Sequence, residues 1–196
     1  MSALRFKPWV RKNAYGKLLG KRVLILGEAH YQRGESGKQH PGLTVELIEN
    51  QITGRGKYAF WTRIVGAFLG HKPNSDEKRD FWPTVAFSNC IQEFAGTGPR
   101  IPPSPEMWAR GELAFAELLE RLKPQAVIVL GYRLWNHLRN IDHVPDFIMD
   151  DPKSLQTRRY AITGGGSALA YAIRHPSSGF NGAKWTPYIR KAIHGA

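Results

Sequence analysis

The sequence predicts an α/β fold, a three-layer αβα sandwich built around a central four-stranded parallel sheet. Its apolar runs are short, rich in Val, Ile and Leu, and separated by longer stretches of helical character. That alternation is typical of parallel strands joined by helical crossovers. With 196 residues, of which 42% are hydrophobic and 22% charged, the chain is expected to form a single domain over 1–196.

The expected strands are apolar runs that end in glycine or polar residues. They are 22–27, 84–89, 125–131 and 168–174. A glycine turn over 163–167 precedes the last strand and follows the short apolar segment 159–162. This pattern favours a hairpin, or a strand with a flexible approach.

The clearest expected helix covers 105–122. Ser104 can cap it, Pro105 suits the first helical position, and Pro124 follows its end. Its apolar stripe is expected to face the core. Further helices are expected over 43–52, 60–69, 132–138 and 184–193, and the polar segment 71–80 is expected to be a surface loop.

Basic charge is concentrated at both ends of the chain. The formal net charge is +12 and the sequence pI is about 10. Residues 1–27 hold seven Lys or Arg and no acid, and no carboxylate side chain follows Asp151. If both ends lie on one face, that face attracts a polyanion, and nucleic acid is the leading candidate. The alternative is a charge that serves solubility alone.

Composition also indicates the expected compartment. Cys90 is the single cysteine, so the chain forms no internal disulfide and no multi-cysteine metal site. No apolar run reaches the length of a membrane span, and the first residues lack the apolar core of a signal peptide. We expect a monomer in the cytoplasm, associated with the nucleoid if the source is bacterial, with no membrane partner and no cofactor.

Polar residues follow the expected strands at the ends where α/β sheets build ligand sites. The first strand is followed by Gly27-Glu28-Ala29-His30-Tyr31, the second ends at Asn89, and the last is followed by His175-Pro176-Ser177. Glu28, His30 and His40 could be considered as metal ligands. Their spacing matches no known ligand pattern, so a polar loop is the favoured interpretation and no metal is expected.

These three motifs, in this order, resemble those of the uracil-DNA glycosylase superfamily. That family has a four-stranded parallel sheet flanked by helices. Its first motif is Gly-Gln-Asp-Pro-Tyr or Gly-Glu-Ala-Pro-Gly, its second strand ends in Asn, and its last strand ends in His-Pro-Ser. The segment 126–131 and the following Leu134-Trp135 are similar to its third strand and helix. The resemblance covers most of the chain and implies a uracil-DNA glycosylase-like fold.

The resemblance also implies roles at the base. His175 would donate a hydrogen bond to O2 of the departing base, and Asn89 would read its Watson–Crick edge. Tyr31 would crowd the pyrimidine C5, and Gly27 would also belong to the base-binding site. The alternatives are a histidine that orders the turn before Pro176, an asparagine that caps a loop, and a tyrosine that only packs.

DNA contacts would follow the last strand. Ser177 could hold a phosphate, Phe180 could fill the stack left by a flipped nucleotide, and Lys184 and Arg190 could add phosphate contacts. An ordinary core position is the alternative for Phe180. The strand form of the DNA is not specified by these residues.

The chain departs from the family at two positions. Ala29 stands where an Asp positions the attacking water, so Glu28 would have to supply the carboxylate. His30 replaces the usual Pro and could orient water or cap the loop. The Gly-Glu-Ala branch of the family carries four cysteines for an iron–sulfur cluster, and this chain has one.

Three functions remain open at this point. The first is a DNA glycosylase-like hydrolase that cleaves the N-glycosidic bond of a flipped uracil-like or modified pyrimidine base, as in base-excision repair. The second is a nucleic-acid-binding protein on the same fold whose chemistry is lost or redirected. The third is a hydrolase or transferase acting on a small nucleotide-like compound.

Overall fold

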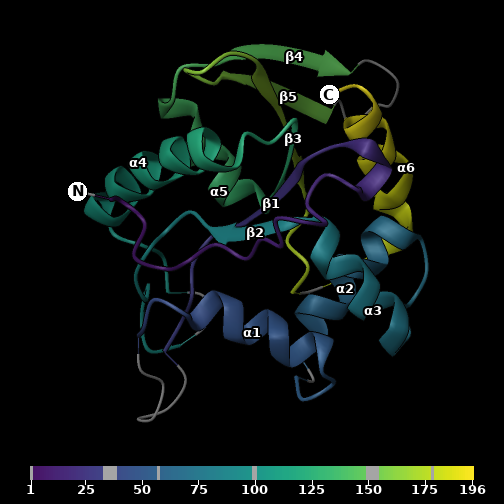
Figure 1. Ribbon diagram of the computed structural model, residues 1–196. Helices are drawn as coiled ribbons and strands as arrows, with labels where there is room; N and C mark the ends of the chain where they lie inside the picture. Colours follow the sequence, from purple (N-terminus) through teal and green to yellow (C-terminus); the bar gives the residue numbers. More distant parts are fainter. Residues whose placement is uncertain (1, 33–38, 57, 99–100, 149–154, 178) are drawn as a thin grey trace.

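In the computed structural model, all strands belong to one sheet with helices on both sides (Figure 1). The structure describes residues 2–32, 39–56, 58–98, 101–148, 155–177 and 179–196. The sheet has six strands in the order β2-β1-β3-β6-β5-β4. The expected α/β class is confirmed.

Four strands of the sheet run in the same direction. They are β2 (Ala86–Asn89), β1 (Val23–Gly27), β3 (Ala126–Leu130) and β6 (Ser167–Ile173). Each lies within two residues of a strand predicted from the sequence. Their apolar runs are continuous because helices cover both faces of this part of the sheet.

The sheet is larger than the predicted four parallel strands. β5 (Leu155–Ala161) pairs antiparallel with β6, and β4 (Val144–Ile148) pairs antiparallel with β5. The glycine turn between β5 and β6 therefore closes the predicted hairpin. β4 was missed because Pro145 and Asp146 interrupt its apolar run. Proline is tolerated there because β4 is an edge strand.

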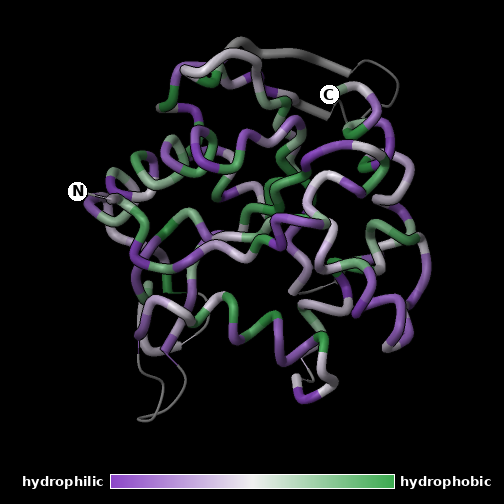
Figure 2. Tube along the Cα trace, viewed as in Figure 1, coloured by the Kyte–Doolittle hydropathy of each residue, from purple (hydrophilic) through white to green (hydrophobic). Residues whose placement is uncertain are grey.

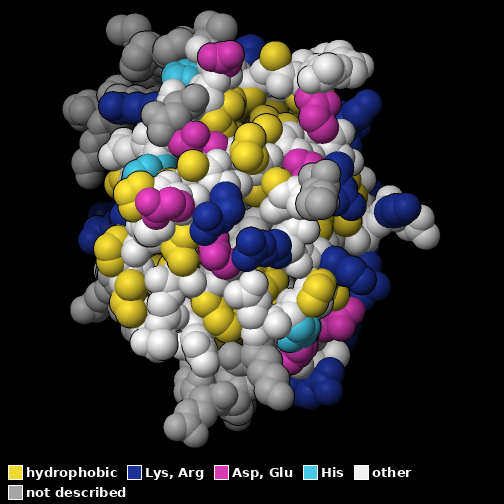
Figure 3. Space-filling view, turned by 90° about the vertical axis from the view of Figure 1, so that its left-hand side faces the viewer, with side chains coloured by type: hydrophobic (Ala, Val, Ile, Leu, Met, Phe, Trp, Pro, Cys, Tyr) yellow, Lys and Arg dark blue, Asp and Glu magenta, His cyan; other side chains and the backbone are white. Residues whose placement is uncertain are grey.

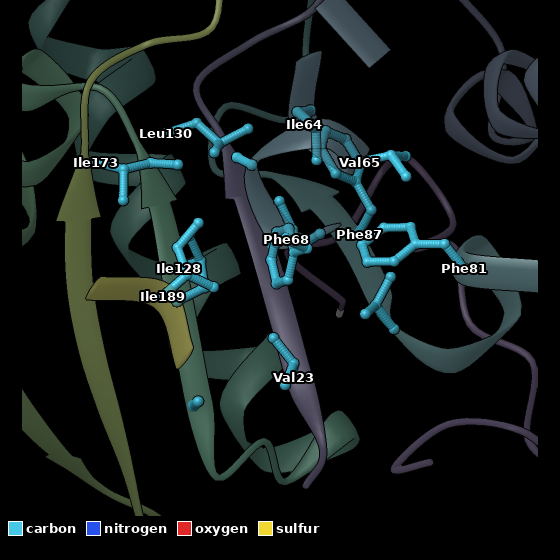
Figure 4. Close-up of a cluster of buried hydrophobic side chains, with 14 of the residues drawn as sticks. Val23, Ile64, Val65, Phe68, Phe81, Phe87, Ile128, Leu130, Ile173 and Ile189 are labelled. Carbon is cyan, nitrogen blue, oxygen red and sulfur yellow. The ribbon is translucent and has the colours of Figure 1, made fainter. Parts of the chain in front are cut away.

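Alternation along the strands divides the core between the two faces. Val23, Ile25 and Ile128 face a cluster with α2 (Ala59–Leu69) and α6 (Gly182–His194), which α1 (Leu43–Ile52) joins through Ile48. Figure 4 shows part of this cluster. Leu24 and Val127 face the opposite cluster, with α4 (Pro105–Leu122) and α5 (Tyr132–His137). Hydrophobic segments accordingly gather at the centre of the molecule (Figure 2).

The ends of α4 agree with the sequence signals. The Ser104 hydroxyl accepts a hydrogen bond from the Met107 amide at 3.3 Å, and Lys123 ends the helix with a left-handed φ of 44°. No helix in the described ranges is both long and apolar enough to cross a membrane.

The predicted loop over 71–80 is wrong. It contains α3 (Ser75–Phe81), which begins with a capping box. The Asn74 side chain accepts from the Glu77 amide at 2.8 Å, and the Glu77 carboxylate accepts from the Asn74 amide at 2.8 Å. This Asn-x-x-Glu signal was present in the sequence but was hidden by the strongly polar composition around it.

The carboxyl ends of the four parallel strands meet at one edge of the sheet. In Figure 4 the strand arrows point the same way, with Leu130 and Ile173 near the arrowheads and Val23 at the other end. We call this the carboxyl edge. The residues after β1, β2, β3 and β6 therefore lie at the same end of the sheet.

Candidate functional site

The first pair of site residues joins β1 and β2. Gly27 and Asn89 are partners in the parallel register. A Cβ at Gly27 would overlap Oδ1 of Asn89 and lie 3.1 Å from Cζ of Phe87, so only glycine allows the amide to lie over β1. Asn89 is 4% exposed, and among described residues no group hydrogen-bonds to its side-chain amide. The amide is held in place by packing, with its donor and acceptor uncommitted to that part of the chain.

An ion pair spans the point where the strand order reverses. β1 lies between β2 and β3, and the gap between the ends of β1 and β3 is the usual ligand position in such sheets. Glu28, directly after β1, is 8% exposed. Arg133 of α5 donates from Nε to Oε2 of Glu28 at 2.8 Å and from Nη2 to Oε1. This bidentate geometry fixes both planar groups.

The backbone around Glu28 is also fixed. The amide of Cys90 donates to the carbonyl of Gly27 at 2.9 Å, and the amide of Ile91 donates to that of Glu28 at 2.8 Å. These bonds continue the pairing of β1 and β2 beyond the strands. The carboxylate is therefore positioned before any ligand binds.

His175 lies two residues after β6 and is held in a defined tautomer. Its Nδ1 accepts from the Ser177 amide at 3.2 Å and lies 2.8 Å from the Ser177 hydroxyl. Because Nδ1 is an acceptor, Nε2 carries the proton of the neutral ring. The ring stacks on Phe60, with centroids 5.4 Å apart. It also lies against Gly131, where an added Cβ would be 3.3 Å from the His175 Cβ and 3.4 Å from the ring atom Cδ2.

The turn that carries His175 is supported from α2. Arg63 donates from Nη1 to the carbonyls of Pro176 at 3.0 Å and Ser177 at 2.8 Å. Phe60, one helical turn earlier, supplies the stacking surface. The N-terminal half of α2 thus positions the histidine. Phe60 stacks on the ring, and Arg63 binds the backbone carbonyls of the turn.

The electrostatics keep His175 neutral near pH 7. Burial lowers the pKa of His175 below its ordinary value, Glu28 raises that pKa, and Arg133 lowers it. The two members of the ion pair therefore act on the imidazole with opposite signs. The ring is therefore neutral and carries an N–H donor on Nε2.

Tyr31 joins the same cluster. Its hydroxyl lies 3.4 Å from Oε1 of Glu28, and burial followed by the Glu28 charge raises the pKa of the phenol. The side chain is half-buried. The structure thus places Tyr31 beside the carboxylate that follows β1.

His30, for which the sequence allowed a role in orienting water or in capping the loop, packs between Phe6 and α1. It is 7% exposed, its Nε2 lies 2.8 Å from Oγ1 of Thr44, and its ring packs edge-on against Phe6 at 5.0 Å. Burial lowers the pKa of His30 to about 4. The histidine connects the segment after β1 to α1 and stays neutral.

The considered metal ligands are also separated. Glu28 pairs with Arg133, His30 contacts Thr44, and His40 lies 3.2 Å from Glu46. Across the described ranges no group of three His, Cys, Asp or Glu side chains is arranged to hold a metal ion.

The predicted DNA-contacting residues divide into two groups. Ser177 and Lys184 are exposed near the carboxyl edge, where α6 begins. Arg190 is exposed but lies six residues further along α6, about 9 Å away along the helix axis. Phe180 packs against the core and stacks on Trp185 at 6.5 Å, so it is a packing residue in this conformation.

The N-terminal basic residues do not form one uninterrupted basic face. Nη2 of Arg11 lies 3.1 Å from Oε1 of Glu49, and Nη1 of Arg5 lies 3.7 Å from Oε2 of Glu93. Figure 3 shows one side of the molecule, on which Lys and Arg side chains lie beside acidic and hydrophobic ones. Acids from the middle of the chain therefore offset part of the N-terminal charge.

Three residues of the site were missed by reasoning from the sequence. Arg133 follows β3 by three residues, a strand-end position as informative as those of Glu28 and His175. Phe60 and Arg63 lie on the helix expected over 60–69, to which the sequence assigned no functional role. Their contacts with the His175 turn join segments more than 100 residues apart, which no local pattern indicates.

Comparisons with known proteins add no family to this picture. A scan of the chain against models of protein families finds no match, and a search of curated proteins finds no significant relative.

Proposed function

We propose that this protein is a DNA glycosylase-like hydrolase that cleaves the N-glycosidic bond of a flipped uracil-like or modified pyrimidine base. The observation that carries the proposal is the state of His175, a neutral ring whose proton lies on Nε2 because Nδ1 accepts from the Ser177 turn. Asn89 and the Glu28–Arg133 pair lie on neighbouring strand ends.

Each group matches a requirement of that reaction. Breaking the bond between C1′ and the base nitrogen leaves negative charge on the base and positive charge on the sugar. The His175 Nε2–H would donate to the oxygen on which the negative charge develops. The Asn89 amide offers a donor and an acceptor side by side, as a pyrimidine edge requires.

Glu28 would act on the water. Oxygen of water bonds to C1′ as the bond to the base breaks, the bonding electrons stay with the base, and a water proton must leave. A carboxylate held by Arg133 keeps lone pairs that can accept from that water. Arg133 also offsets the negative charge of Glu28, so the electrostatic stabilisation of the sugar cation by Glu28 is expected to be weak. The main role expected for the carboxylate is to orient the water.

A second function is favoured by one observation. Ala29 takes the position of the acid in the motif that this chain resembles, and both oxygens of Glu28 already accept hydrogen bonds from Arg133. A binding protein that holds a flipped base without cleaving the bond would have the same arrangement. Base recognition by Asn89 is common to both functions.

The test is release of bases from a panel of oligonucleotides that contain uracil, modified cytosines or thymine mismatches, in single and double strands. Alkali cleavage then reveals abasic sites. We expect release of at least one base by the wild type, and strong loss in Asn89→Ala, with Asn136→Ala, an exposed position on α5, as the control. DNA binding that depends on Asn89 without release of any base would establish the second function. Release that survives in both Asn89→Ala and His175→Ala would rule out the assigned roles.

A further inference from the structure

A cleft lies beside the ion pair, between α4 and α5. Its volume is about 480 Å³, within the range of sites that bind small molecules. The walls come from the prolines of 102–105, from Trp108, Ala109 and Glu112 of α4, and from Arg133 and His137 of α5. None of the residues predicted from the sequence as functional lines it.

The cleft contains a rigid aromatic surface. Trp108 and Glu112 are four residues apart on α4, and Arg133 and His137 are four residues apart on α5, so each pair shares a helix face. The Trp108 and His137 rings are stacked, with centroids 3.7 Å apart and planes 7° from parallel. Trp108 is only 6% exposed and serves as the base of this surface. The groups left open to a nucleobase are the half-buried His137 ring and the exposed Pro102 and Pro105, which are flat groups of the kind on which bases stack.

Arg133 connects this cleft to the candidate site. Two of its five N–H donors bind Glu28, and 44% of its side chain is exposed. Its outer donors can therefore bind an anion without breaking the pair. Glu112, the carboxylate in the lining, repels a phosphate, so the charges favour a nucleotide whose phosphate lies on Arg133.

We propose that the cleft binds the base of a nucleotide next to the one at the carboxyl edge, with the connecting phosphate on Arg133. The inference rests on the proposed function for the choice of nucleic acid as the ligand. It extends that function by giving the protein a second base-binding position, which makes binding depend on a neighbouring nucleotide.

The test blocks the cleft without altering the ion pair. Ala109→Trp places a large side chain in the cleft, and Ala116→Trp is the matched control, since Ala116 is also exposed on α4 but does not line the cleft. Binding of a labelled single-stranded 11-mer is followed by fluorescence anisotropy. We expect about tenfold weaker binding for Ala109→Trp, which corresponds to loss of one stacked base, and no change for Ala116→Trp.

Photocrosslinking supplies a readout that needs no variant. An oligonucleotide with 5-iodocytosine at successive positions is irradiated with the wild-type protein and digested with trypsin. We expect crosslinks in the peptides 101–110 or 134–139, which carry Trp108 and His137. Crosslinks found only in other peptides, or wild-type protein that binds no DNA, would overturn the proposal.

The two proposals fail in different ways. Base release by the wild type, combined with unchanged DNA binding by Ala109→Trp, would overturn the proposal for the cleft but support the glycosylase function. Weaker binding by Ala109→Trp, with no base released from any oligonucleotide by the wild type, would support base binding in the cleft and favour the binding function over the glycosylase.

Discussion

The segments that follow β1 and β6 each carry a histidine just beyond a parallel strand, yet the two histidines are placed differently. His30 is sealed between Thr44 and Phe6. His175 stacks on Phe60 and accepts from the Ser177 turn. Burial lowers the pKa of both rings. Position after a strand therefore brings a histidine to the carboxyl edge, and the neighbouring helix decides whether the ring faces the site or the core.

The largest expected difference between the two histidines is in catalysis. His175→Ala should slow base release by about 10²–10³-fold, because it removes one positioned donor to the departing base. His30→Ala, in the fraction that remains folded, should retain most of the rate. Single-turnover release from the substrate found in the oligonucleotide panel measures this. Equal losses in the two folded variants would contradict the distinction between the segments.

The second expected difference is in stability against acid. The folded-state pKa of His30 is about 4, below the ordinary 6.5, so the unfolded chain binds the extra proton first as pH falls. The contribution of His30 to the free energy of unfolding is fully present above pH 6.5 and decreases by about 3 kcal/mol as the pH falls toward 4. Urea unfolding of wild type and His30→Gln at pH 7 and pH 4 measures the difference. An identical pH dependence in the two proteins would show that His30 does not cause it.

The third prediction concerns the ion pair that accompanies the β1 segment. Arg133→Ala leaves the Glu28 carboxylate nearly buried without its partner, and should cost about 2 kcal/mol of unfolding free energy after allowance for the half-exposed arginine. Arg121→Ala on α4 is the control, since its pair with Glu117 is more exposed and should cost below about 1 kcal/mol. Urea denaturation of both variants gives the values. Equal costs would mean that the Glu28 pair is an ordinary surface ion pair.

The smallest effect is expected at the contact between β1 and β2. Gly27→Ala should displace the Asn89 amide because the added Cβ overlaps its Oδ1, at a cost of about 1 kcal/mol in stability. Affinity for the flipped base should fall with it, whereas binding to DNA that lacks the base should not change. Titration of the two DNAs, with the Asn89 position checked by crystallography, tests this. If the Asn89 side chain keeps its position in Gly27→Ala, the close contact with Asn89 is not the reason for a glycine at position 27.

The positions of the parallel strands and of most helices were predictable from the sequence. Strands buried on both faces must be apolar throughout, and α4 carries its own capping and ending residues. Segments whose stability depends on partners were not predictable. β4 forms a strand because it pairs with β5. Its own sequence contains Pro145 and Asp146, which are unfavourable in strands. α3 was misjudged because polar composition outweighed a real capping box.

The candidate site was predictable only in part. Gly27 and Asn89 end strands, Glu28, Tyr31 and His175 follow strands, and parallel strands must end at a common edge. His30 has the same sequence signal but faces α1, because the pairing of its segment with residues after β2 turns the ring inward. Arg133 and Phe60 could be recognised only through the residues that they contact.

The sequence by itself therefore determined the four parallel strands and most of the helices, where the strand ends place polar groups, and where the excess of positive charge lies along the chain. Tertiary structure alone decided the partners of those groups: Arg133 for Glu28, Phe60 and Ser177 for His175, and Thr44 for His30. The physical reason is range. Secondary structure follows from local backbone preference and apolar periodicity, whereas protonation, orientation and access depend on side chains brought together from distant segments.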